Sequence, residues 1–415
     1  MNSNGRNRQF RTIAGASALL IAGTFGLAAC ATDEPQDDTP AAAAGSTSDL
    51  PSDQASGDPV KIGFVSTEGG AAVSLPEMRE GAEAAVEYLN NNGGGLAGRP
   101  VDLVVCKQQE EPTSATACAN QFVEQDVAAV LSPGTSMGPA IVPIVIGAGI
   151  PYVTLNGVAP IELTSPDVAS LSAGLPGTLT AAATAAQQEG MSTFTMFASD
   201  GGGIAAMIDQ MGKPIFEGFG VELEVVPVAL GIPDPTPVVT SGLTSNPDGV
   251  SFIGDAATCT SVLKAVQTTA PTVTKVLIPT CLEENVVKAI GIDNVQGNIG
   301  ITATDALSDR PDTVLFRSIL AEYAPDLSPT GYGSTGYQTV MALAGATDSI
   351  TGAVDATSIR EALRTAQNVE MPAGGGITFT CNGTAFPMMP SICSSQMLIG
   401  EINDQGIPEN LTVTG

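Results

Sequence analysis

The clearest chemical motif in this sequence is Gly134-Thr135-Ser136-Met137-Gly138, which matches G-x-S-x-G, the pattern of a nucleophilic serine at a strand-to-helix turn. The serine of that pattern needs a general base, which is commonly histidine, and the chain contains no His. A Ser-His-Asp hydrolase is therefore excluded. An exported hydrolase that uses Ser136 stays an alternative only if another base, such as a lysine, lies beside that serine.

The same residues suit a second chemistry, the binding of an anion. Backbone N–H groups at the start of a helix, together with the hydroxyls of Thr135 and Ser136, form a site for negative charge. The alternative is that the hydroxyls only cap the helix. Asn156-Gly157 follows the next expected strand and is a second candidate, although Asn-Gly also suits a plain turn.

Several acidic residues lie just past expected strands, where ligands of open α/β sheets bind. Asp255 and Glu283 each follow such a strand and could pair with a ligand ammonium. The alternative is that each acid stabilises the N-terminus of a helix through the helix dipole. Glu68 after the first strand and Asp305 further along are additional candidates.

Charge and composition exclude other classes of function. The formal net charge is -28, from 15 Lys+Arg and 43 Asp+Glu, so we expect no nucleic-acid partner. The run Gly331–Gly336 matches G-x-G-x-x-G, but no strand precedes it, so we interpret it as the loop that opens a helix over 337–344. Without His or a C-x-x-C pair, we predict no metal and no cofactor.

The N-terminus is predicted to be a targeting segment. Three arginines precede an apolar stretch over 13–27, and Leu27-Ala28-Ala29-Cys30 resembles a bacterial lipobox. We therefore expect residues 1–29 to be a lipoprotein signal peptide and Cys30 to be the lipidated first residue, anchored on the outer face of the cytoplasmic membrane. The alternative is ordinary cleavage beside an incidental cysteine. Residues 30–58 are acidic and are predicted to be a disordered tether.

From residue 60 onwards, short apolar runs alternate with amphipathic stretches, which indicates an α/β fold with mainly parallel sheets flanked by helices. The expected strands are 60–65, 101–105, 128–131, 152–155, 193–198, 223–228, 250–253 and 276–278. The expected helices are 78–89, 115–123, 140–146, 180–188, 204–216, 259–266, 313–323, 337–344 and 359–366, and β patterning returns over 377–413. The two series predict two similar lobes.

This order resembles the type I periplasmic-binding-protein family, in its leucine/isoleucine/valine-binding branch that serves ABC transporters. The segments that carry the resemblance include VKIGFVSTEGG, REGAEAAVEYLNNNGGGLAGRPVDLVV, SATACANQFVEQDVAAVLSPGTS, FRSILAEYAPDLSPTGYGSTGYQTVMAL and SIREALRTAQNVEMPAGGGITF. The resemblance implies two lobes joined by a three-strand hinge. Transferred to this chain, the lobes are 59–174 plus 304–372 and 175–303 plus 373–415.

The resemblance also implies a function. A protein of this kind is a monomer that captures an amino acid or a similar small carboxylate-bearing molecule between closing lobes and docks on an ABC permease, without catalysis. A sensory lipoprotein without transport is the alternative. In the family, the loop that holds Thr135 and Ser136 binds the ligand α-carboxylate, and the residues after the next strand, here Asn156, contact the amine. Asp200 and Gly202 follow the first strand of lobe two, and Gly stands where many relatives carry a Tyr that covers the ligand.

The cysteine content favours disulfides. There are seven cysteines, so six remain besides Cys30, an even number in a chain expected to be exported. Sequence alone leaves the pairing open. The fold implied by the family resemblance favours sequential pairs, which are Cys106 with Cys118, Cys259 with Cys281 and Cys381 with Cys393.

Overall fold

The computed structural model describes residues 50–70, 73–200 and 203–415. The predicted signal peptide, Cys30 and the first part of the predicted tether lie outside the described residues. Residues 50–58, the rest of that tether, are hydrogen bonded to the chain that follows. The N–H groups of Asp53 and Ala55 donate to the carbonyls of Asn92 and Asn90, at 3.2 and 3.1 Å.

The first sheet has five parallel strands in the order β2-β1-β3-β4-β5. Its strands are Val60–Thr67 (β1), Val101–Gln108 (β2), Ala129–Ser132 (β3), Tyr152–Thr154 (β4) and Val168–Ser170 (β5). The helices between them are Pro76–Asn91 (α1), Pro112–Glu124 (α2), Gly138–Gly147 (α3) and Pro160–Thr164 (α4). Three of these helices begin at a proline, whose fixed φ and missing N–H suit the first helical turn. All residues of β3 are buried, as expected for a parallel sheet covered on both faces.

The second sheet has seven strands in the order β14-β13-β10-β9-β8-β6-β7. Its strands are Thr193–Asp200 (β6), Glu222–Ala229 (β7), Gly249–Ile253 (β8), Thr274–Leu277 (β9), Ile299–Thr302 (β10), Met397–Ile402 (β13) and Pro408–Thr414 (β14). The strands from β6 to β10 are parallel, whereas β13 pairs antiparallel with β10 and with β14. Its helices are Gly174–Gln188 (α5), Ile204–Gly218 (α6), Thr236–Gly242 (α7), Ala256–Thr269 (α8) and Glu284–Ile290 (α9).

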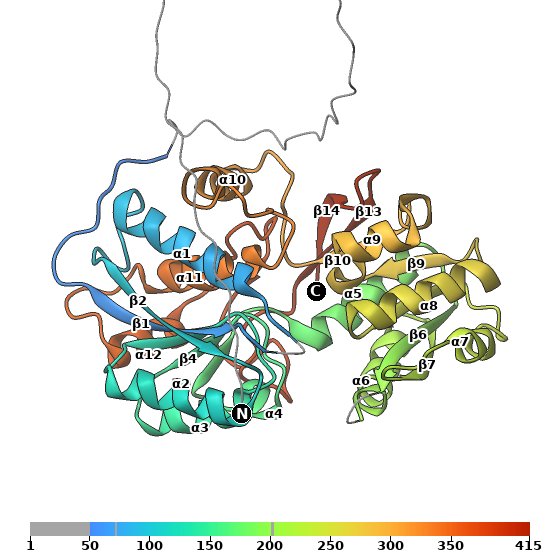
Figure 1. The fold of residues 1–415 in the computed structure, drawn as a ribbon, viewed down its shortest axis with the longest axis horizontal. Helices are drawn as coiled ribbons and strands as arrows, with labels where there is room; N and C mark the ends of the chain where they lie inside the picture. Colours follow the sequence, from blue (N-terminus) through green and yellow to red (C-terminus); the bar gives the residue numbers. More distant parts are fainter. Residues whose placement is uncertain (1–49, 71–72, 201–202) are drawn as a thin grey trace, which may run out of the picture. The chain divides into compact units, whose positions relative to one another are not determined.

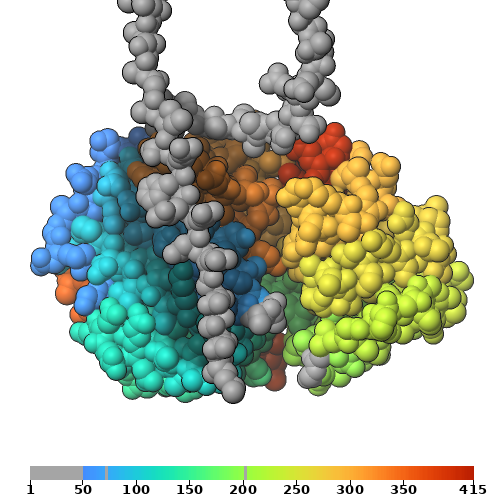
Figure 2. Space-filling model, in the orientation of Figure 1, coloured from blue at the N-terminus to red at the C-terminus, as the bar shows by residue number. Residues whose placement is uncertain are grey.

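The chain passes between the two sheets three times: after β5, after β10, and before β13. Between the second and third passages lie three helices and a short hairpin: Pro311–Tyr323 (α10), Gly333–Thr347 (α11), Ala356–Thr365 (α12), Val369–Glu370 (β11) and Thr378–Phe379 (β12). Helices α10 and α11 pack on α1, so they belong with the first sheet (Figure 1). Figure 2 shows the surface of the same chain, coloured along the sequence. The predicted α/β class with mainly parallel sheets is confirmed.

The lobe boundaries predicted from the sequence stay a prediction. The hydrophobic clusters are relevant to the boundary predicted between residues 372 and 373. The cluster beneath the first sheet includes Phe316, Tyr337 and Ile359 from the helices α10 to α12. It also includes Ile377 and Phe379, which the prediction assigned to the second lobe.

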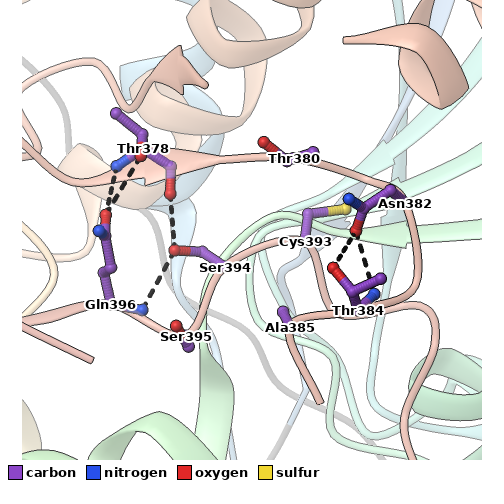
Figure 3. A pocket seen from close by; sticks show the side chains of 9 residues that line it. All are labelled: Thr378, Thr380, Asn382, Thr384, Ala385, Cys393, Ser394, Ser395 and Gln396. Carbon is purple, nitrogen blue, oxygen red and sulfur yellow. Dashed lines mark hydrogen bonds between the residues drawn. The ribbon is translucent and has the colours of Figure 1, made fainter. Parts of the chain in front are cut away.

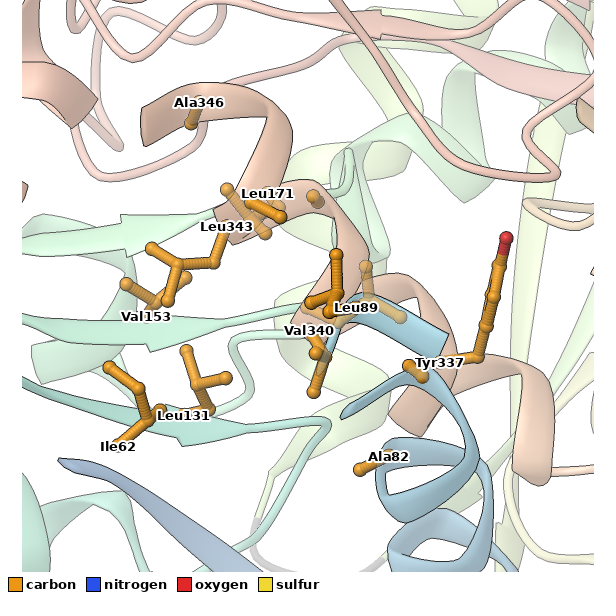
Figure 4. Close-up of a cluster of buried hydrophobic side chains, with 14 of the residues drawn as sticks. Ile62, Ala82, Leu89, Leu131, Val153, Leu171, Tyr337, Val340, Leu343 and Ala346 are labelled. Atoms are coloured by element: carbon orange, nitrogen blue, oxygen red, sulfur yellow. The ribbon is translucent and has the colours of Figure 1, made fainter. Parts of the chain in front are cut away.

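Helix α11 packs both on the first sheet and on α1. In Figure 4 its side chain Leu343 lies beside Val153 of β4. On its other side, α11 crosses α1 at glycines: a Cβ built on Gly336 would lie 1.7 Å from the carbonyl oxygen of Met78. The helix begins at Gly333, so most of the G-x-G-x-x-G run is helical, and its interpretation as a loop is wrong. Gly336 of this run serves a close helix crossing.

The structure contains the three disulfides that the family resemblance favours, Cys106–Cys118, Cys259–Cys281 and Cys381–Cys393. The first joins the end of β2 to α2, within the first-sheet region. The second lies wholly in the core beneath the second sheet, where both sulfur-bearing residues are buried. No bond of these three links elements of one sheet to elements of the other.

Candidate ligand-binding site

Polar residues gather where the parallel strands of the first sheet end. Strands β1 to β4 run in one direction, so the segments after them meet at one edge of the sheet. The hydroxyl of Thr67, the last residue of β1, donates to the carbonyl of Gly134 at 3.4 Å. The N–H of Asn156 donates to the carbonyl of Pro133 at 3.1 Å. The predicted candidates after β3 and β4 are therefore neighbours in space.

A residue that the sequence analysis did not single out lies at the centre of this edge. Glu110, in the turn between β2 and α2, directs its carboxylate at the loop after β3. Its Oε1 accepts from the Thr135 hydroxyl at 2.7 Å and from the Gln108 amide at 2.6 Å. Its Oε2 accepts from the Ser136 backbone N–H at 3.2 Å and also from the Ser136 hydroxyl.

Two opposing effects set the charge of Glu110. Its partial burial favours the neutral acid, but the hydrogen bonds from Ser136, Thr135 and Gln108 lower its pKa more, so the net pKa lies below the usual value of 4.5. Glu110 is therefore an anion at neutral pH. A depressed pKa also makes this carboxylate a weak general base, so the pair of Ser136 and Glu110 does not supply the activated nucleophile that a hydrolase needs.

The hydroxyls of the loop do not cap helix α3. The residue before the helix is Met137, and no side chain accepts a hydrogen bond there in the manner of an N-cap. Instead, the Thr135 hydroxyl oxygen accepts from the Met137 N–H at 3.0 Å, which fixes the turn. Thr135 is buried and Ser136 is exposed, so the serine is the more accessible of the two hydroxyls.

The candidates after β4 are held by hydroxyl groups from the end of β5 and from the segment that follows it. The Asn156 side-chain oxygen accepts from the Ser172 hydroxyl at 2.7 Å. The Gly157 N–H donates to the Ser170 hydroxyl oxygen at 3.2 Å. These bonds fix the Asn-Gly turn beside Gly134, and a ligand contact there stays a prediction.

Glu68 lies at the same edge but is already paired with cations. Its carboxylate contacts the Arg79 guanidinium at 2.9 Å and the Lys107 ammonium at 2.6 Å. Burial works to raise the pKa of Glu68, but Arg79 and Lys107 lower it further, so the net pKa is below its usual value. Two positive charges thus balance this candidate, and its predicted contact with a ligand stays untested.

The two acids predicted after strands of the second sheet have different surroundings. Asp255 is the N-cap of α8 and accepts from the Thr258 N–H at 2.9 Å, so the helix-capping interpretation describes its contacts. Glu283 accepts from the Tyr332 hydroxyl at 3.1 Å, and burial raises the pKa of Glu283 although this hydrogen bond lowers it in part. Burial and the nearby Glu283 raise the pKa of Tyr332 to about 12, so this phenol is a donor at neutral pH.

The remaining candidates contribute less. Asp305 is buried and accepts from the Ser308 N–H at 3.1 Å, which makes it part of the turn that follows β10. Asp200 is exposed at the end of β6. Gly202 lies outside the described residues. The ligand contacts predicted for these residues stay predictions.

The sequence contains a signal for Glu110, which depends on where β2 ends. The expected strand 101–105 ends too early, because β2 continues through Cys106 and Lys107 to Gln108. With β2 extended to Gln108, Glu110 follows the same rule as Thr135 and Asn156, namely a polar residue just past a parallel strand. Lys107 and Gln108 are polar, so the apolar pattern ended before them. Both nevertheless continue the pairing of β2 with β1.

A separate polar cavity of about 170 Å³ lies beside β12 and the Cys381–Cys393 disulfide (Figure 3). Its polar groups bond to one another: the Gln396 side-chain oxygen accepts from the Thr378 N–H at 2.7 Å, and Ser394 donates to the Thr378 carbonyl at 2.7 Å. None of the predicted ligand residues lines this cavity. We therefore do not assign it as the ligand site.

Across residues 50–70, 73–200 and 203–415, no three His, Cys, Asp or Glu side chains are grouped so that they could hold a metal ion. No helix in the same ranges combines the length and the apolar character that a membrane crossing requires.

Comparison with known proteins gives one family match. The model of a family described as periplasmic binding protein matches residues 59–406. A search of curated protein sequences finds no significant match.

Solved structures resemble the chain over most of its length. A leucine-binding protein from Thermotoga maritima is 18% identical, with a TM-score of 0.68, and the match covers 86% of this chain and 98% of that one. A branched-chain amino acid transporter substrate-binding protein from Streptococcus pneumoniae, in complex with isoleucine, is 15% identical over 86% and 99% of the two chains, with a TM-score of 0.67. An ABC transporter solute-binding protein from Rhodopseudomonas palustris, in complex with p-hydroxybenzoic acid, is 20% identical over 83% and 93%, with a TM-score of 0.68.

Proposed function

Since the chain belongs to the periplasmic binding protein family, whose members bind solutes for ABC transporters and are not enzymes, we propose that it captures a small polar solute outside the cytoplasm and presents it to an ABC permease. The two sheets with their helices would act as two lobes that close on the solute. The three passages of the chain between the sheets would serve as the hinge.

The observation that carries this proposal is the gathering of polar groups from four segments at the carboxyl edge of the first sheet. Ligands of open parallel sheets bind at this edge. Thr135 and Ser136 would contribute to the site, together with Asn156 and with acids of the second lobe such as Glu283. The proposed solute has the size of an amino acid, as in the relatives that bind isoleucine and p-hydroxybenzoic acid.

A melting-temperature screen of the purified protein tests solute capture. The screen contains amino acids, amides, short peptides and organic acids. A true ligand at about 100 times its Kd stabilises the folded state by about 2.7 kcal/mol, which raises the melting temperature measurably. If no solute of this size raises it, the capture proposal is wrong.

The double substitution Thr135→Ala, Ser136→Ala tests the location of the site. We expect it to weaken binding of the identified solute by roughly 1–3 kcal/mol, because polar contacts in the site are lost. The measurement is calorimetric titration. The control is Ser358→Ala, which removes a hydroxyl from the first turn of α12, where Ser358 accepts from the Asp355 N–H. The control should lower stability by about 1 kcal/mol and leave affinity unchanged. Equal affinity in the double variant and the unaltered protein would place the solute elsewhere.

We also propose that the protein is a lipoprotein anchored through Cys30, which its lipobox-like segment supports. Replacement of Cys30 by alanine should release the protein from the membrane, because the acyl chains supply the anchor and each buried methylene contributes about 0.8 kcal/mol. Fractionation of cells and mass spectrometry of the N-terminal peptide measure this. Normal processing and continued membrane attachment of the variant would contradict the anchor.

A further inference from the structure

The carboxylate of Glu110 is hydrogen bonded to the same donor groups that would bind an anionic ligand. The Ser136 N–H and the hydroxyls of Ser136 and Thr135 are the donors that the sequence predicted for an anion, which the family resemblance implies to be the ligand carboxylate. All three donate to Glu110.

This internal anion is fully hydrogen bonded without a countercharge. Besides the loop donors, Glu110 Oε1 accepts from the Gln108 amide at 2.6 Å. A carboxylate can accept about four hydrogen bonds, so these contacts satisfy the Glu110 carboxylate within the protein. Within the described residues, none of the ion pairs includes Glu110, and the nearby cations Arg79 and Lys107 are bound to Glu68. Glu110 itself is therefore held by hydrogen bonds and not by an ion pair.

The turn that carries Glu110 is built to hold it in this place. Glu110 has a φ of 55°, a left-handed conformation that costs free energy for a residue with a side chain. Its N–H donates to the Gln108 side-chain oxygen at 2.7 Å, and the Gln108 amide nitrogen contacts the Glu110 carboxylate. The buried Gln108 therefore fixes both the backbone and the side chain of Glu110.

We propose that Glu110 occupies the anion position of the first lobe as a built-in carboxylate, so that the solute meets this edge through a cationic ammonium or guanidinium group and not through a carboxylate. This inference rests on the proposed function and narrows its ligand class. A second carboxylate here would find its donors in use and would face a negative charge. A cation would gain a carboxylate that takes part in none of the ion pairs of the described residues.

The first arm of the test uses acetate as the probe and does not depend on knowing the solute. Backbone amide signals are followed by NMR during acetate titration of the unaltered protein, of Glu110→Ala and of Glu110→Gln. We expect acetate to shift the Ser136 amide saturably in Glu110→Ala, because its donors become free, and not in the unaltered protein. Glu111→Ala is the matched control, since Glu111 is the exposed neighbour and makes no capping bond with α2. It should behave as the unaltered protein does.

Two outcomes of this arm overturn the inference. If acetate shifts the Ser136 amide signal as much in the unaltered protein as in Glu110→Ala, a carboxylate ligand can displace the Glu110 side chain from these donors. If acetate shifts this amide in neither Glu110 variant, the loop is not an anion position. Glu110→Gln keeps the shape of the side chain while it removes the charge, so it decides the question if the alanine variant does not fold.

The second arm compares solutes that differ in one group. The pairs are leucine with leucinamide, and 4-hydroxybenzoate with 4-hydroxybenzylamine, each scored by the melting temperature of the unaltered protein and of Glu110→Gln. We expect the amine-bearing solutes without a carboxylate to bind the unaltered protein about tenfold more tightly than their acids, and this preference to fall in Glu110→Gln. A carboxylic acid that stabilises the unaltered protein more than its amine partner would overturn the inference. If neither these probes nor any solute of the wider screen binds, the proposed function fails, while the acetate result still decides the role of Glu110.

Discussion

Gly336→Ala is expected to destabilise the protein by about 3 kcal/mol or more, because the added methyl group would collide with the backbone of a neighbouring helix. A Cβ on Gly336 would lie 1.7 Å from the Met78 carbonyl oxygen and 3.0 Å from the Ala82 backbone nitrogen, both in α1. Backbone atoms of a helix cannot turn aside as a flexible side chain can. The two helices must therefore separate, and the core that Tyr337 shares with them opens.

Gly345→Ala is the matched control, on the same helix and with the same chemical change. Its Cβ would approach no closer than 3.4 Å, to the Val369 Cγ1. The gain in helix propensity offsets this contact, so we expect a change within about 1 kcal/mol. Guanidinium unfolding followed by circular dichroism measures both variants. Equal stability of the two variants would mean that α1 and α11 do not cross at Gly336.

Glu162→Ala is the second substitution with a large expected effect. Glu162 is buried, and its Oε1 accepts from the Tyr152 hydroxyl at 3.0 Å. Its Oε2 accepts from the backbone N–H groups of Val158 and Ala159, at 3.1 and 3.0 Å. The alanine variant leaves three donors without their partner, of which the Tyr152 hydroxyl and the Ala159 N–H are buried, and each unsatisfied buried group costs about 1–3 kcal/mol. We expect a loss of about 3 kcal/mol or more, measured by denaturant unfolding.

The charge of Glu162 gives this prediction a pH dependence. Burial raises the pKa of Glu162 above its usual value of 4.5, although the bonds from Ala159, Val158 and Tyr152 lower it in part. The folded state thus holds this proton more tightly than the unfolded state does. The stabilising contribution is complete below the ordinary carboxyl pKa and is lost as the pH rises through the raised pKa of the folded state.

Glu162→Gln isolates this contribution, because glutamine can keep an acceptor for the two N–H groups without a titrating proton. The free energy of unfolding of the unaltered protein should fall, relative to that of Glu162→Gln, as the pH rises above about 4.5. Denaturant unfolding of both proteins over a pH series measures the difference. A constant difference across the series would show that Glu162 does not titrate with a raised pKa.

Local pattern was enough for most elements of the fold. Runs such as 193–198 and stretches such as 204–216 are long enough for their periodicity to identify them, and the structure has β6 and α6 over the same residues with small extensions. The short strands β5 and β10 were not expected. Three or four residues carry too little periodicity, and their extended form depends on pairing with neighbours far along the chain.

For the site, the sequence by itself located the loop of Thr135 and Ser136, since a hydroxyl-rich turn between a strand and a helix is a local feature. Only the tertiary structure shows that the Glu110 carboxylate accepts the hydrogen bonds of that loop. Glu110 lies 25 residues earlier in the chain than Thr135. The two meet because β2 and β3 both pair with β1 in parallel, which brings the ends of separate strands to one edge.

The glycine run at the start of α11 is a second case in which the sequence and the tertiary structure each supply a different part of the answer, here for packing. From the sequence, the absence of a preceding strand was sufficient to reject a dinucleotide site at Gly331–Gly336. The need for glycine at 336 became visible only with the carbonyl of Met78 in place against it. Periodicity and turn chemistry act between neighbours in the chain and can be read there, whereas close contacts depend on which distant segments the sheet order and helix crossings bring together.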